Sequence, residues 1–165
     1  MTIHVGEGYD IHRLVEGRRL VLGGVEIPYG KGLLGHSDAD VLLHAVTDAL
    51  LGASGRGDIG DRFPPSDPQW KDADSRKLLE TVLGEVRAAG WEVVNVDSTV
   101  IAEEPKLYPW KSKIREKLAG LLGIATQDVN VKAKTNERLD AVGNGSAIAA
   151  EAVVLLETRP QAEAF

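Results

Sequence analysis

The sequence predicts an α/β (α+β) fold, in which a mixed β-sheet has helices packed on one face. Segments with strand and helix periodicity are interspersed, in the approximate order β, ββ, α, α, β, α, β, β. Residues 147–157 form a nearly continuous apolar run, which is typical of a buried central strand. The helices cover only one face of such a sheet. Its other face is therefore either solvated by polar side chains or packed against another subunit.

The expected elements of the N-terminal half begin with a strand whose glycines, Gly6 and Gly8, allow a neighbouring backbone to approach closely. A hairpin that turns at Gly23-Gly24 comes next. In order, the elements are a strand at residues 2–12, the hairpin at 19–28, a glycine-rich loop at 29–35, a helix that ends near 53, a second glycine-rich loop at 52–62 and an exposed turn at 63–68.

Capping residues mark the starts of the predicted helices. Ser37 or Asp38 is the expected N-cap of the first helix, and Ser75 is that of the second, which stops at Gly90. Pro109 suits the first turn of a third helix. The C-terminal half then comprises helices at 75–90 and 109–123, strands at 91–102, 129–135 and 147–157, and a short helix or loop at 136–140.

Composition restricts the function classes. The net charge is −6 and the basic residues are scattered, which argues against a nucleic-acid surface. The chain contains no cysteine, so any metal must be held by His, Asp or Glu. No apolar run is long enough to span a bilayer, and no signal peptide is recognisable. We therefore expect a cytoplasmic enzyme or binding protein with no nucleic-acid or membrane partner.

Three side chains are candidates for a metal site. Asp10 and His12 are two residues apart on a predicted strand and so share one face. His44 lies about two turns into the predicted helix. One carboxylate and two imidazoles leave a coordination position open, as in catalytic zinc sites. The alternative is that Asp10 makes a turn, His12 is half-buried on its strand and the helix is merely capped. Only a tertiary contact can decide between the two.

Two further features have open interpretations. The unpaired N–H groups at the start of the helix near Ser37 favour phosphate, next to the candidate metal ligands. Glu151 interrupts the apolar run near the C-terminus. It either faces solvent or is a paired carboxylate in a subunit interface, because a buried charge needs partners.

The motif His36-Ser37-Asp38-Ala39-Asp40, with His44 downstream, resembles the 2-C-methyl-D-erythritol 2,4-cyclodiphosphate synthase family of the non-mevalonate isoprenoid pathway. The resemblance is collinear and runs nearly end to end, through residues 8–12, 23–28, 32–40, 41–52, 57–60, 74–75, 105–106 and 129–135. It implies one cyclodiphosphate-synthase-like domain at 1–165. It also implies a homotrimer, with the uncovered sheet face toward the trimer centre and active sites between adjacent subunits.

The resemblance further implies a lyase and its metals. In the family, the 2-phosphate of 4-diphosphocytidyl-2-C-methyl-D-erythritol 2-phosphate attacks the β-phosphorus, CMP leaves, and a cyclic diphosphate forms. Asp10, His12 and His44 would hold zinc or a similar divalent ion. Glu137 would hold magnesium or manganese, which bridges the substrate phosphates. The protein needs no nucleophile of its own, because the substrate carries one.

Other roles follow from the same resemblance. His36 and Ser37 would meet the phosphates of the methylerythritol half, and Asp58 and Gly60 would hold the ribose. The implied catalytic residues are His36, Thr135 and Glu137. The implied substrate-binding residues are Asp10, His12, His36, Ser37, Asp58, Gly60, Ala102, Pro105, Lys106, Leu107, Ala133, Lys134 and Thr135.

The chain departs from the family pattern in a few places. Ala141 and Asn144 stand where the family has a Phe and an Arg at the mouth of the central trimer cavity. We therefore expect isoprenoid diphosphates to bind there weakly or not at all. Pro65 replaces a common Asp and receives no role.

Two other function classes are alternatives to the cyclase. One is a divalent-metal-dependent nucleotide phosphohydrolase, and another is a non-enzymatic trimer that binds isoprenoid or nucleotide ligands. Two histidines and one carboxylate would also suit a non-haem iron oxygenase, which nothing else in the sequence supports.

Overall fold

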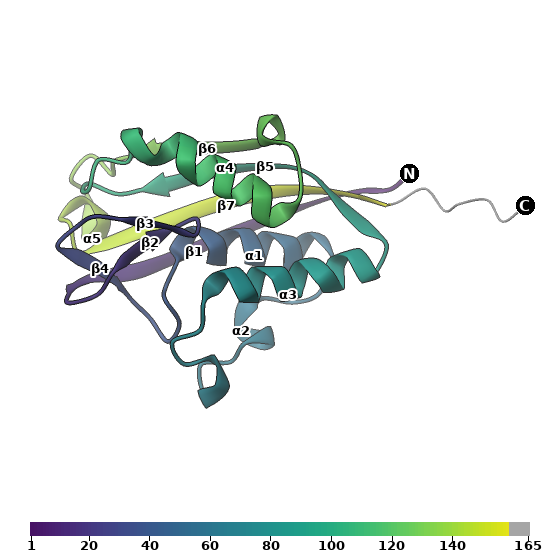
Figure 1. Ribbon diagram of the computed structural model, residues 1–165, viewed down its shortest axis with the longest axis horizontal. Helices are drawn as coiled ribbons and strands as arrows, with labels where there is room; N and C mark the ends of the chain where they lie inside the picture. Colours follow the sequence, from purple (N-terminus) through teal and green to yellow (C-terminus); the bar gives the residue numbers. More distant parts are fainter. Residues whose placement is uncertain (159–165) are drawn as a thin grey trace, which may run out of the picture.

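A five-stranded mixed sheet forms the body of the protein in the computed structural model, which describes residues 1–158. The strand order is β4-β1-β7-β5-β6, and β2 and β3 form a separate hairpin (Figure 1). The strands are β1 (Ile3–Glu16), β2 (Leu20–Leu22), β3 (Val25–Ile27), β4 (Lys31–Leu34), β5 (Trp91–Ile101), β6 (Val129–Lys134) and β7 (Ala147–Thr158). The central place of β7 confirms the prediction from its apolar run.

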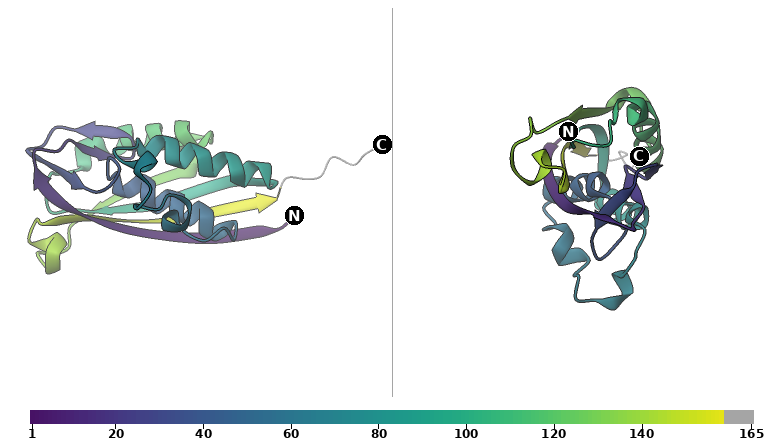
Figure 2. Two further views of the ribbon diagram at one scale, coloured as in Figure 1. Left: turned by 90° about the horizontal axis from the view of Figure 1, so that it is seen from below. Right: turned by 90° about the vertical axis from the view of Figure 1, so that its left-hand side faces the viewer.

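Helices α1, α3 and α4 cover one face of the sheet, as predicted (Figure 2). The helices are α1 (Val41–Ala53), α2 (Ile59–Arg62), α3 (Ser75–Ala88), α4 (Lys111–Leu122) and α5 (Asp140–Gly143). Single 3₁₀ turns occupy Pro68–Trp70, Tyr108–Trp110 and Thr126–Asp128. No helix within residues 1–158 is both long and apolar enough to cross a membrane.

Gly6 and Gly8 allow α1 to lie directly on β1. A Cβ added to Gly6 would come 1.9 Å from the carbonyl oxygen of Ala49, and one added to Gly8 would come 1.9 Å from that of Ala45. Any larger residue would push the helix off the strand. This close approach confirms the prediction for the two glycines and brings the middle of α1 against the part of β1 that follows Gly8.

The β2–β3 hairpin turns at Gly23-Gly24, as predicted, and both residues have positive φ values, of 60° and 75°. Their N–H groups donate to the two carboxylate oxygens of Asp40, at 2.9 Å and 2.7 Å. Asp40 also accepts from the N–H of Leu43, at 3.0 Å. One buried carboxylate thus caps α1 and fixes the hairpin against it.

The capping predictions were wrong by a few residues. Asp40 is the N-cap of α1 in place of Ser37 or Asp38, and Asp74 is the N-cap of α3 in place of Ser75. Two predicted loops also contain regular structure. Residues Lys31–Leu34 form an edge strand that pairs with β1, and Ile59–Arg62 form a short helix. Both segments were predicted as loops because they are rich in glycine.

The uncovered face of the sheet is rich in exposed apolar side chains. Register places Tyr9 opposite Glu151, and Glu7 opposite Val153, so these residues point to the same face. Val5 is 65% exposed and Tyr9 is 50% exposed. The exposed large apolar side chains of this face are Ile3, Val5, Tyr9, Ile11 and Val153. Polar solvation of the whole face was one of the two sequence interpretations, and this composition disfavours it.

Candidate active site

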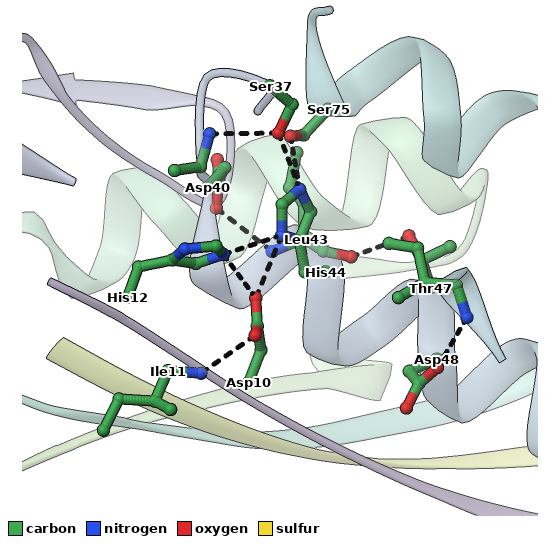
Figure 3. A network of polar contacts seen from close by, with 12 residues as sticks. Asp10, Ile11, His12, Ser37, Asp40, Leu43, His44, Thr47, Asp48 and Ser75 are labelled. Atoms are coloured by element: carbon green, nitrogen blue, oxygen red, sulfur yellow. Dashed lines mark hydrogen bonds and ion pairs between the residues drawn. The ribbon is translucent and has the colours of Figure 1, made fainter. Parts of the chain in front are cut away.

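Asp10, His12 and His44 come together at the contact between β1 and α1 (Figure 3). Nε2 of His12 and Nδ1 of His44 each lie 2.9 Å from Oδ2 of Asp10. The two ring nitrogens are 3.2 Å apart. The tertiary contact that the sequence could not supply is therefore present, and the alternative of unconnected structural residues is wrong.

The three side chains fit a divalent metal. Their ligand atoms lie within 4.8 Å of one another, and among residues 1–158 they form the group of His, Asp and Glu side chains that meets this condition. Two imidazole nitrogens and one carboxylate oxygen are a donor set that zinc favours. Nδ1 of His12 is 2.9 Å from the carbonyl oxygen of Leu34, which leaves Nε2 to face the other ligands.

Electrostatics inside the group favour an ionised carboxylate. Burial alone would raise the pKa of Asp10, but the hydrogen bond from His12 and the proximity of the His44 ring outweigh it and lower this pKa from 3.8 to about 2. Burial alone would lower the pKa of His12, but its hydrogen bond to Asp10 and the charge of Asp10 raise it above 6.5. Protons therefore compete with a metal for His12 in acid.

A cavity of about 260 Å³ opens beside the group. Its walls combine the three candidate ligands with His36, Ser37 and Gly60, all assigned from the resemblance. The remaining lining residues are Ile59, Phe63, Pro65, Trp70 and Leu78. Pro65, to which no role was assigned, thus lies in the wall of the cavity. Asp48 accepts the N–H of Ile59 at 2.9 Å, which holds α2 at the cavity.

Asp58 does not line this cavity in the single chain. Its carboxylate accepts the N–H of Asp61 at 2.9 Å and caps α2. The ribose contact proposed for Asp58 would therefore have to share the carboxylate with a helix cap. His36 does line the cavity, and its Nε2 lies 3.2 Å from the carbonyl oxygen of Asp67.

His44 is held from its far side by residues that the sequence analysis treated as caps. Nε2 of His44 lies 2.8 Å from Oγ of Ser75 and 3.2 Å from Oγ of Ser37. The Ser75 hydroxyl donates in turn to Asp38. These contacts explain why Ser37, Asp38 and Ser75 are not the N-caps. No local pattern links Asp38 to Ser75, so their pairing could not be found from sequence spacing.

A second, smaller cavity of about 160 Å³ lies where β5 and β6 end. The resemblance assigned seven residues to the cytosine and phosphate end of the substrate, and all seven line this cavity together with Tyr108. They are Ala102, Pro105, Lys106, Leu107, Ala133, Lys134 and Thr135. The parallel pairing of β5 with β6 brings the two groups together, because both strands end at the same edge.

Glu137 lies in the loop just beyond this cavity, apart from the Asp10, His12 and His44 group. Glu137, Arg138 and Asp140 have φ values of 51°, 61° and 56°, which non-glycine residues rarely adopt. Oε1 of Glu103 accepts the N–H groups of Asn136 and Arg138, each at 3.0 Å. Glu103 was missed by the sequence analysis, since nothing local ties it to residues 33 and 35 positions away.

A larger cavity, of about 650 Å³, adjoins Ser37 and Asp38 from the hairpin side. Its three arginines are already engaged: Arg18 with the carbonyl oxygen of Ser37, Arg19 with Glu26, and Arg76 with Asp74. Asp72 also lines it, so charges of both signs are present. We assign it no ligand.

Comparison with known proteins agrees with the resemblance. The family model described as YgbB family matches residues 3–157. The 2-C-methyl-D-erythritol 2,4-cyclodiphosphate synthase of Neisseria gonorrhoeae (strain ATCC 700825 / FA 1090) is 60% identical over 155 residues, which cover 94% of this chain and 97% of the relative. That of Gloeobacter violaceus (strain ATCC 29082 / PCC 7421) is 61% identical over 155 residues, covering 94% of this chain and 95% of the relative.

Solved structures give the same picture. A CDP-bound 2C-methyl-D-erythritol-2,4-cyclodiphosphate synthase aligns with a TM-score of 0.86 at 40% identity, over 93% of this chain and 99% of that one. The bifunctional IspDF of Campylobacter jejuni aligns with a TM-score of 0.92 at 40% identity, over 96% of this chain. The present chain spans 43% of that longer protein. By sequence and by fold, this chain belongs to the YgbB family of 2-C-methyl-D-erythritol 2,4-cyclodiphosphate synthases.

Proposed function

We propose that the protein converts 4-diphosphocytidyl-2-C-methyl-D-erythritol 2-phosphate to 2-C-methyl-D-erythritol 2,4-cyclodiphosphate and CMP. The observation that carries the proposal is the meeting of Asp10, His12 and His44 on one cavity that Ser37 and His36 also line. A phosphate needs cations and N–H or O–H donors around it, and this cavity offers a candidate metal group and donors in one place. The relatives at about 60% identity are named as the synthase that makes this cyclic diphosphate.

The proposed reaction is an intramolecular phosphoryl transfer. An oxygen of the 2-phosphate forms a bond to the β-phosphorus, the bond from the β-phosphorus to the bridging oxygen breaks, and CMP leaves with that electron pair. His36 and Ser37 would orient the phosphates of the methylerythritol half. Thr135 and Lys134 would hold the CMP side. Such positioning of an attached nucleophile is worth an effective molarity of about 10⁵ M or more.

Two metal positions belong to this proposal. Asp10, His12 and His44 would hold zinc or a similar divalent ion, and Glu137 would hold magnesium or manganese. The ions, when bound, would supply charge neutralisation to the phosphates as Lewis acids. All further steps need only binding, orientation and exclusion of water by the chain.

We also propose that the single domain at 1–165 assembles as a homotrimer whose active sites lie between subunits. Two observations support this. The uncovered sheet face carries exposed Val5, Tyr9 and Val153. In addition, the cavity beside Asp10, His12 and His44 (the metal cavity) and the cavity at the ends of β5 and β6 (the nucleotide cavity) are lined by separate sets of residues. A neighbouring subunit would bury the uncovered sheet face and bring its nucleotide cavity opposite the metal cavity. Glu151, exposed at the middle of that face, would then need a partner across the interface.

Light scattering at micromolar concentration tests the assembly, and we expect about three times the 17.7 kDa of one chain. Val5→Glu should shift the mass toward monomer, because it adds a charge to the apolar face. Tyr29→Glu, at an exposed aromatic in the loop between β3 and β4 that lines neither cavity, is the matched control and should remain a trimer. A wild-type mass of one chain would contradict the proposed assembly.

Phosphorus NMR of the products tests the reaction. With the cytidyl substrate and a divalent ion, we expect CMP and an equal amount of the cyclic diphosphate. CDP alone should be hydrolysed far more slowly, because water lacks the attached nucleophile's effective molarity. Linear phosphorylated fragments in place of the cyclic product would favour the phosphohydrolase. Binding of CDP without any turnover would favour the non-enzymatic trimer.

A further inference from the structure

We infer that Asp38 and Ser75 form a positioning pair that fixes the tautomer of His44, so that Nδ1 presents its lone pair to a divalent metal. The inference rests on metal binding by Asp10, His12 and His44 within the proposed function, and it is independent of which reaction follows. Nothing in the family pattern quoted above assigns this role to either residue. Figure 3 shows the chain of contacts from Asp10 through His44 to Ser75.

The first step concerns the proton of the Ser75 hydroxyl. Oδ1 of Asp38 accepts from this hydroxyl and also from the N–H of Asp40, at 3.1 Å. Oδ2 of Asp38 accepts from the N–H of Ser75 at 3.1 Å. A carboxylate has no proton to give. The hydroxyl proton of Ser75 is therefore committed to Asp38, and its oxygen is left with lone pairs only.

The second step concerns the imidazole. Nε2 of His44 lies 2.8 Å from Oγ of Ser75, so Nε2 must be the donor in this hydrogen bond. A neutral imidazole carries one N–H, which leaves Nδ1 without a proton. Nδ1 is the atom that faces Asp10 and His12. The pair thus selects the tautomer that a metal needs.

Burial makes the selection energetically effective. Ser75 is 0% exposed and His44 is 9% exposed, so water cannot replace either partner cheaply. Oγ of Ser37 is a weaker second acceptor, at 3.2 Å. Ser37 also accepts the N–H of Ala39 at 3.1 Å and lines the cavity. The hydroxyl proton of Ser37 therefore remains for a ligand, whereas that of Ser75 is committed to Asp38 and the Ser75 oxygen accepts from His44.

The pair is anchored at the start of α3. The N–H of Asp38 donates to the carbonyl oxygen of Ala73 at 3.0 Å, and the N–H of Asp72 donates to that of His36 at 2.7 Å. These bonds tie the loop before α1 to the loop before α3. Asp38 and Ser75 consequently keep their distance from His44 as one rigid unit.

Zinc affinity without substrate provides the main test. Wild-type protein, Ser75→Ala and Asp38→Ala are titrated with zinc against a competing chelator. Loss of an outer hydrogen-bond partner typically costs about 10- to 100-fold in metal affinity, and we expect that loss for both variants. Asp74→Ala is the matched control, because it removes the N-cap of α3 and leaves the Ser75 side chain in place. It should lower the melting temperature and keep the wild-type zinc affinity.

Nitrogen-15 NMR of the His44 ring gives a readout that a structural role would not move. The zinc-loaded wild type should show a protonated Nε2 and a metal-bound Nδ1. Ser75→Thr, which retains the hydroxyl, should retain both the spectrum and the affinity. Ser75→Ala with zinc affinity within twofold of wild type would overturn the inference, as would a wild type that binds no zinc. Zinc binding without cyclisation would instead overturn the proposed function alone.

Discussion

The metal cavity and the nucleotide cavity are built in opposite ways. The first takes its chemistry from side chains of β1 and α1, and its ligand His44 is buried among further polar partners. The second lies at the ends of β5 and β6, beside a loop in which three non-glycine residues adopt left-handed conformations. Buried hydrogen bonds keep the side chains of the metal cavity in place. Beside the nucleotide cavity, a residue outside the loop keeps the loop backbone in its conformation.

This difference has an energetic side. A buried, fully paired network keeps its shape because each broken bond leaves an unsatisfied group. A left-handed non-glycine residue costs about 1–3 kcal/mol and persists only where its surroundings enforce it. In the loop at residues 135–140 (the nucleotide loop), the carboxylate of Glu103 accepts two backbone N–H groups and so helps to hold this conformation. We therefore expect variants in the metal cavity to abolish function and variants in the nucleotide loop to weaken it by degrees.

The largest effect is expected from His12→Ala. Removal of one of three ligands should abolish metal binding and activity together, because the remaining two are too few for a zinc site. The fold should survive, since the His12 side chain is at the rim of the core and 20% exposed. Metal content by elemental analysis and turnover by product release measure the two effects. Full activity of the wild type after exhaustive chelation would contradict this prediction.

His4→Ala is the matched control for that experiment. His4 is also on β1, and its Nδ1 lies 2.9 Å from the carbonyl oxygen of Ala53, at the far end of α1. Its ring packs against Trp91. The control should lose some stability and keep both metal and activity.

The part of the metal cavity that the sequence predicted is the part set by local spacing. Asp10 and His12 share a face because a strand has a period of two, and the glycines before them indicate that another backbone approaches closely. The outer partners were assigned wrongly as caps, because Ser37, Asp38 and Ser75 are good N-cap residues in isolation. Their hydrogen bonds to His44 and to each other are tertiary contacts, and these outweigh the capping propensity.

In the nucleotide region, too, the features set by local patterns were predicted and those set by tertiary contacts were not. The strands 91–102 and 129–135 were predicted from composition and alternation, and the structure has Trp91–Ile101 and Val129–Lys134. The loop from Thr135 to Asp140 carries no glycine, so its positive φ values had no sequence signal. The edge strand Lys31–Leu34 was missed for the reverse reason, since glycines suggested a loop where pairing with β1 supplies the order.

Glu137→Gln should produce the next largest effect, on rate and not on nucleotide affinity. The amide keeps the size of the side chain but removes the charge that would hold magnesium or manganese. We expect turnover to fall by about 10²-fold or more, as for loss of one electrostatic contact to a transition state. CDP affinity should change less than threefold, because the proposed function assigns the cytidine end to other residues. Steady-state kinetics and calorimetry measure the two quantities.

Glu116→Gln, on the exposed side of α4, controls for the loss of one negative charge and should leave the rate unchanged. An equal fall in rate and in CDP affinity for Glu137→Gln would count against a metal role for Glu137. That result would place Glu137 in nucleotide binding instead.

The smallest effect is expected at Glu103, which acts on Glu137 through the backbone. One oxygen of Glu103 holds the N–H groups on both sides of Glu137, those of Asn136 and Arg138. Glu103→Leu removes that acceptor, so the loop should relax from its left-handed conformation and Glu137 should occupy its working position for less of the time. We expect turnover to fall by about tenfold, equivalent to about 1.4 kcal/mol. Glu103→Gln retains an acceptor oxygen in the same place and should stay within threefold of wild type. Hydrogen exchange at the amides of Asn136 and Arg138 should quicken in Glu103→Leu and not in Glu103→Gln. If both variants turned over like the wild type while those amides exchanged faster, the loop would be shown to reach its working conformation without Glu103, and backbone enforcement would have to come from the bound nucleotide or from a neighbouring subunit.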